Sequence, residues 1–60
     1  GADPVAAAEV RVELAATLNT SERSRARELV DQALPVLREA LLPIAPARIE
    51  AERLWGALQQ

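Results

Sequence analysis

The stretch SERSRARELVDQALPVLREALL, residues 21–42, decides the fold of this chain of 60 residues. At 100° per residue, its apolar and charged side chains separate onto opposite sides, which is typical of an amphipathic helix. Pro35 falls within the charged side, where a continuous but bent helix keeps a proline. The pattern predicts one helix over 21–42, kinked at Pro35, rather than two short ones. Its expected buried face comprises Ala26, Leu29, Val30, Ala33, Leu34, Val36, Leu37, Ala40, Leu41 and Ile44.

Two further helices flank this segment. Asp3-Pro4 predicts a helix start, because aspartate is a good N-cap and proline loses no needed hydrogen bond at the first helical position. This helix should cover 4–18 and stop at Asn19, while Thr20 or Ser21 caps the helix over 21–42. A third helix is expected over 46–58.

The connections between these helices indicate how they pack. Pro43 and Pro46 interrupt the helical pattern, and Pro46 can begin the third helix. Short connections place consecutive helices side by side in opposite directions. We therefore predict an all-α fold, a small antiparallel three-helix bundle that forms a single domain over 1–60. Residues 1–3 would be an N-terminal tail, in which Gly1 and Ala2 are consistent with a cloning remnant.

Composition limits how such a chain can be stabilised. A chain of 60 residues hides only about 60% of its unfolded surface on folding, so a small bundle is marginally stable. Cysteine and histidine are both absent from the sequence, which removes disulfides and the commonest metal ligands. We expect a protein partner to supply the missing stability, and we expect no cofactor, metal ion or small-molecule substrate. The compartment stays open, with the cytoplasm slightly favoured.

The helix over 4–18 carries two apolar arcs where an ordinary surface helix has one. Val5, Ala8, Val12, Ala15 and Ala16 form the first arc, and Ala7, Val10, Leu14 and Leu18 form the second. The other two helices can cover only one of them. A simpler interpretation is that the alanines are good helix formers that tolerate water, but Val10 and Leu14 still need a cover. The simplest cover is a second copy of the chain in a homodimer.

The helix over 46–58 has an inner stripe of Ala47, Ala51, Leu54, Trp55 and Leu58. Trp55, the only aromatic residue, fits either a core position, which its place on the stripe favours, or an interface anchor. Ile49 lies off the stripe, so it either packs back on Ile44 or belongs to an exposed apolar patch. Arg48 and Glu52 have the spacing of a helical ion pair.

The residue inventory disfavours catalysis. The hydroxyl groups of Ser21, Ser24, Thr17 and Thr20 have neither histidine nor lysine to activate them. The carboxylates fall on predicted solvent-facing sides, whereas acid–base catalysis needs carboxylates of different pKa inside a cleft. We therefore do not expect an enzyme.

The cluster Arg23, Arg25 and Arg27 is the best argument for nucleic-acid binding. The three arginines spread around the helix, Glu22 and Glu28 flank them, and the net charge of the chain is −2. Phosphate binding needs the opposite balance, so a solvated face is the favoured interpretation. Membrane binding is disfavoured as well, because this polar face carries charges of both signs.

These observations predict a soluble, non-catalytic module for dimerisation or docking of a larger protein or assembly through apolar helix faces. The alternatives are a helix-turn-helix-like DNA-binding or regulatory module and a structural fragment of a larger enzyme. The residues expected at the interface are Val10, Leu14, Leu18, Ile49 and Trp55.

Overall fold

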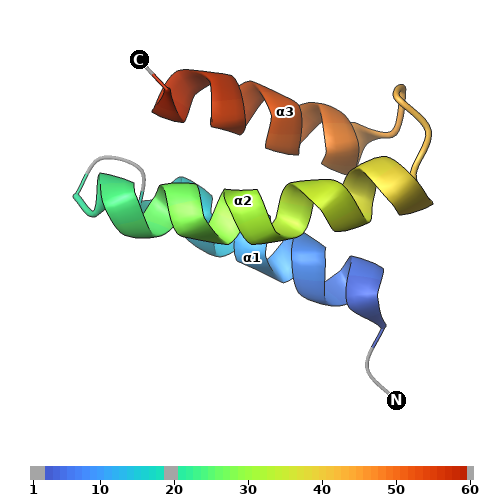
Figure 1. Cartoon of the computed structure of the whole chain (residues 1–60), viewed down its shortest axis with the longest axis horizontal. Coiled ribbons are helices and arrows are strands. Elements are labelled where there is room, and N and C mark those ends of the chain that lie inside the picture. The colour runs from blue at the N-terminus through green and yellow to red at the C-terminus, as the bar shows by residue number, and fades with distance from the viewer. Residues whose placement is uncertain (1–2, 19–20, 60) are drawn as a thin grey trace.

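The computed structural model describes residues 3–18 and 21–59, which form three α-helices and no strand (Figure 1). The helices are α1 (Pro4–Leu18), α2 (Arg23–Ala40) and α3 (Pro46–Leu58). The predicted all-α, three-helix arrangement is confirmed. α2 packs against both other helices, whereas α1 and α3 touch each other much less. The Cα trace measures 30 × 25 × 14 Å.

The outer helices begin at the predicted residues. The Asp3 carboxylate Oδ1 accepts a hydrogen bond from the backbone N–H of Val5 at 2.9 Å, which satisfies one of the free N–H groups of the first turn of α1. Pro46 occupies the first turn of α3, where its missing N–H costs nothing. The expected stop of α1 at Asn19 lies outside the described residues.

The central helix is two residues shorter at each end than predicted. Its N-cap is Glu22, which makes no side-chain capping bond, so the proposed cap Ser21 is wrong and Thr20 lies outside the described residues. At the other end Leu41 takes an extended backbone, with φ −118° and ψ 149°. Pro43 prevents the helix from continuing further, because a proline disfavours helical backbone in the residue before it, which is Leu42.

Pro35 lies inside α2, and the helix is continuous through it. Its side chain is exposed, as expected of a proline on the charged side of the helix. The prediction of one helix is confirmed, and the size of the kink stays a prediction.

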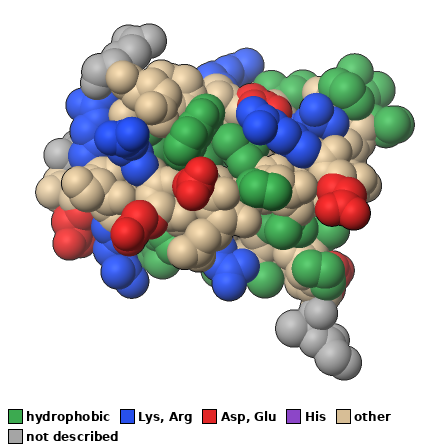
Figure 2. Space-filling view, viewed as in Figure 1, with side chains coloured by type: hydrophobic (Ala, Val, Ile, Leu, Met, Phe, Trp, Pro, Cys, Tyr) green, Lys and Arg blue, Asp and Glu red, His purple; other side chains and the backbone are tan. Residues whose placement is uncertain are grey.

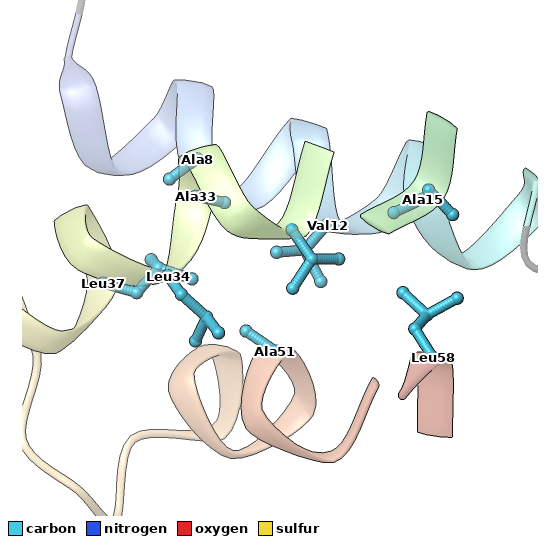
Figure 3. Close-up of a cluster of buried hydrophobic side chains, with 10 residues drawn as sticks. Ala8, Val12, Ala15, Ala33, Leu34, Leu37, Ala51 and Leu58 are labelled. Carbon is cyan, nitrogen blue, oxygen red and sulfur yellow. The ribbon is translucent and has the colours of Figure 1, made fainter. Parts of the chain in front are cut away.

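The core contains as many alanines as larger residues. It comprises Ala8, Val12, Ala15, Ala26, Val30, Ala33, Leu34, Leu37, Ala51 and Leu58, drawn from all three helices (Figure 3). Alanine side chains end at Cβ, which lets α1 and α2 approach closely but buries little apolar surface per residue. Leu37, Leu58 and Val30 are the largest fully buried side chains. Two residues predicted on the buried face of α2 are exposed, Ala40 and Ile44. Ile44 lies beyond Ala40, where the helix and its rotation end.

Arginines join α2 to α3. Arg38 donates two hydrogen bonds to the Glu52 carboxylate, at 2.7 Å from Nε and 2.6 Å from Nη2. Arg48 Nε lies 3.8 Å from the same carboxylate, which confirms the predicted Arg48–Glu52 pair. Arg48 also donates from Nη1 to the backbone carbonyl of Leu41 at 2.9 Å. This bond holds the end of α2, where helix carbonyls lack partners within the helix.

Because of the Arg38–Glu52 pair, we expect the free energy of unfolding to depend modestly on pH in the acidic range. The hydrogen bonds from Arg38 hold the pKa of Glu52 below its ordinary value. A carboxylate whose pKa is lower in the folded state than in the unfolded state stabilises the folded chain at any pH above its unfolded-state pKa. This stabilisation is lost as the pH falls through the pKa of the folded state. We expect urea unfolding of Glu52→Gln to depend less on pH than that of the parent chain below about pH 5.

The effect should be small, because the pair is exposed to solvent. Glu28→Gln is the matched control, since Glu28 is an exposed carboxylate without an ion pair among the described residues. Equal pH dependence in the two variants would contradict a stabilising role for the pair.

Candidate interaction surfaces

The outer side of α1 carries exposed aliphatic side chains. Val10 is 62% exposed and Leu14 44% exposed. Each is two residues from the buried Val12, so helical geometry turns it about 160° away from the core. Leu18 is half-buried and packs against the core cluster. We call Val10, Leu14 and Leu18 the α1 outer surface.

Trp55 lies apart from this surface. Its ring is half-buried against the core cluster, which is intermediate between a buried core position and an exposed interface anchor. It lines a shallow hollow beside α2, together with Ser24, Arg27, Glu28 and Asp31. These neighbours are polar, so Trp55 joins the core to a charged surface and extends no apolar patch there.

Ile49 belongs to a third location, the beginning of α3 just after its connection to α2. Leu42 and Ile44 are exposed in this connection, at 70% and 78%, and Ile49 is 40% exposed. Figure 2 shows hydrophobic side chains gathered at the end of the molecule where α2 leads into α3. Of the two interpretations of Ile49, this exposure fits the apolar patch. The five predicted interface residues are therefore distributed over three locations rather than joined in one site.

A groove lies between α1 and α3, and the periodicity of the sequence does not predict it. A hollow of about 630 Å³ is lined by Val12, Glu13, Ala16, Thr17, Glu50, Arg53, Leu54 and Ala57. A smaller hollow, lined by Glu9, Val12, Glu13, Ala47 and Glu50, shares three of these residues and continues it. We call the two together the α1–α3 groove. It exists because α1 and α3 both pack on α2 and touch each other little.

Half of the side chains that line the wider part of the groove are apolar. Val12 is buried at its base, Leu54 is half-buried, and Ala16 and Ala57 are exposed. Ala16 was assigned to the buried arc of α1, and it is exposed because α3 does not come close enough to cover it. Thr17 donates its hydroxyl to the Leu14 carbonyl at 2.7 Å, so this donor is already satisfied within α1.

The charged side chains along the groove are unpaired. Glu9, Glu13, Glu50 and Arg53 make no ion pair with any other described residue. Glu52, on another side of α3, is bound by Arg38 and Arg48. Helix α3 therefore presents satisfied charges toward α2 and unsatisfied charges toward the groove.

The basic cluster of α2 has a structural explanation. Arg23 donates to the Ala57 carbonyl at 3.0 Å, and Arg27 donates to the Gln59 side chain at 3.4 Å. Cations are favourable at the end of a helix, where carbonyls carry partial negative charge. Arg23 and Arg27 lie one helical turn apart on the same side of α2, and they contact the end of α3 instead of forming only a solvated face.

The described residues contain no group of three or more acidic side chains arranged to hold a metal ion. None of the described helices combines the length and apolar character that crossing a bilayer requires. Comparisons with protein families, with curated proteins and with solved structures found no match to the chain.

Proposed function

We propose that the chain is a non-catalytic interaction module, an antiparallel bundle that homodimerises through the α1 outer surface and so docks a larger protein or assembly. One observation carries this proposal: the bundle exposes as many large aliphatic side chains as it buries. Val12, Val30, Leu34, Leu37 and Leu58 are buried, whereas Val10, Leu14, Leu42, Ile44 and Ile49 are exposed.

The energetics favour a partner on α1. Complete burial of one large aliphatic side chain stabilises by about 1.5–3 kcal/mol, whereas each buried alanine contributes less. The α1–α2 contact rests largely on alanines, including Ala8, Ala15, Ala26 and Ala33. Burial of Val10 and Leu14 against their copies would add to a monomer that has few large buried side chains.

The geometry of Val10 and Leu14 suits a symmetric contact. The two residues lie one helical turn apart on the same side of α1, the spacing by which side chains of paired helices interdigitate. A two-fold axis beside them would place each side chain against its counterpart in the second copy, since such an interface uses the same patch twice.

Solution mass over a wide dilution series, with helical circular dichroism at each concentration, tests the dimer. We expect a mass twice the 6.5 kDa of the monomer, and some loss of helix as the dimer dissociates. Leu14→Glu should give a folded monomer, because a carboxylate buried at the centre of the interface would lack a partner.

The matched control is Gln32→Glu, which adds the same charge at an exposed position on α2. It should dimerise like the parent chain. A folded monomer at every concentration of the parent chain would overturn the homodimer.

A further inference from the structure

We infer that the α1–α3 groove is a second docking site, which takes an amphipathic helix of a different protein whose apolar stripe is flanked by Lys or Arg. This site is separate from the α1 outer surface proposed for dimerisation. None of the residues that line the groove is Val10, Leu14 or Leu18.

The dimensions of the groove match a short helix. Along α1 it runs from Glu9 to Thr17, which spans about 12 Å at the helical rise per residue. Along α3 it runs from Ala47 to Ala57, about 15 Å. These lengths correspond to between two and three turns of a bound helix.

The walls of the groove determine the apolar side chains that fit. Ala16 on α1 and Ala57 on α3 are short, so space remains between them above Val12 and Leu54. Long aliphatic side chains such as Leu, Ile or Met reach such a base from a neighbouring helix, as in helix-in-groove recognition. The partner should therefore carry these residues at positions i, i+3 or i+4, and i+7.

The charged side chains that line the groove determine which residues should flank the apolar stripe of the partner helix. Glu9, Glu13 and Glu50 gather around the narrow half of the groove, and Arg53 is the one positive side chain that lines either hollow. None of the four is neutralised by another described residue. Covering these carboxylates with a neutral helix would remove water from them without compensation. Flanking Lys or Arg side chains would compensate for this loss and leave their charged ends near the carboxylates.

A second copy of this chain is a poorer occupant. The exposed apolar side of its own α1 is flanked by Glu13 on one edge and by Arg11 on the other, so a second copy would offer positive charge on one flank only and bring a carboxylate to an acidic groove on the other. Arg23 and Arg27, which could supply positive charge, already contact the end of α3.

The test is a titration of the ¹⁵N-labelled chain, followed by NMR, with two designed helical peptides. Both peptides carry the same leucine stripe, flanked by lysine in one and by glutamate in the other. We expect the lysine peptide to shift the amide signals of Glu13, Ala16 and Leu54. We expect it to bind at least about tenfold more tightly than the glutamate peptide. Salt should reduce this preference.

Charge reversal sharpens the test. The double variant Glu13→Lys/Glu50→Lys should prefer the glutamate peptide. The control Glu28→Lys/Glu39→Lys makes the same change of charge at exposed positions on α2, and it should keep the preference of the parent chain.

Three results would overturn the groove site. These are equal affinity for both peptides, shifts centred on the α1 outer surface instead of the groove, and groove signals of the Leu14→Glu variant that move on dilution of the chain alone. Because Leu14→Glu removes the α1 dimer, the last would mean that a second copy covers the groove. None of these outcomes depends on the mass measurement, so the groove and the α1 dimer can fail separately.

Discussion

Leu37→Ala is expected to remove a large part of the stability of the chain at room temperature. Leu37 is fully buried and is one of the few large side chains in a core that is half alanine. Truncating a buried leucine to alanine costs about 2–5 kcal/mol, through lost burial and the cavity left behind. A domain of this length is stable by only about 3–9 kcal/mol in total. The measurement is urea unfolding followed by helical circular dichroism, at one fixed protein concentration because association would shift the midpoint.

The control removes the same side chain from the surface. Leu42 is 70% exposed, so Leu42→Ala should change the free energy of unfolding by less than about 0.5 kcal/mol. If both variants lost the same stability, Leu37 would not have the central place in the core that the structure gives it.

Ala33→Leu should destabilise the chain as well, although it adds apolar surface. Ala33 is fully buried and belongs to the same cluster as Ala8 of α1 (Figure 3). The larger side chain would push α1 away from α2 or force neighbouring side chains out of their preferred rotamers, which costs about 1–3 kcal/mol. Thermal unfolding by circular dichroism should show a lower midpoint.

Ala6→Leu is the matched control, because Ala6 is exposed on α1. It should leave the midpoint nearly unchanged, since alanine and leucine are both good helix formers. An increase in stability for Ala33→Leu would show that the α1–α2 contact has spare space, contrary to the close packing described above.

The sequence predicts the helices well where the signals are local. Asp3-Pro4 and Pro46 mark helix starts through backbone chemistry that involves only neighbouring residues, and both starts are confirmed. The ends of α2 were placed wrongly because two local signals were misjudged. Ser21 has the chemistry of a cap but lies before Glu22, and the helix ends at Ala40, before the Leu42 that Pro43 restricts.

The groove and the Arg38–Glu52 pair depend on distances between helices, which periodicity does not contain. A helical wheel shows that Ala16 shares a side with Val12, but it cannot show that α3 stays too far away to cover Ala16. It also shows Arg38 only as a polar residue of α2, although this side chain binds Glu52 of α3. The sequence identifies Val10 and Leu14 as apolar residues outside the main stripe, and the structure leaves both exposed.

The alanine-rich core reverses the usual relation between side-chain size and tolerance to mutation. In a saturation library selected only for folding, we expect the small residues Ala8, Ala26 and Ala33 to be among the positions that accept the fewest replacements. Val10 and Leu14 should accept polar replacements in that library, because the isolated bundle leaves them in water. In a library selected for assembly, the same two positions should become restrictive. The positions whose tolerance differs between the two selections would then outline the binding surfaces directly, even before any partner is isolated.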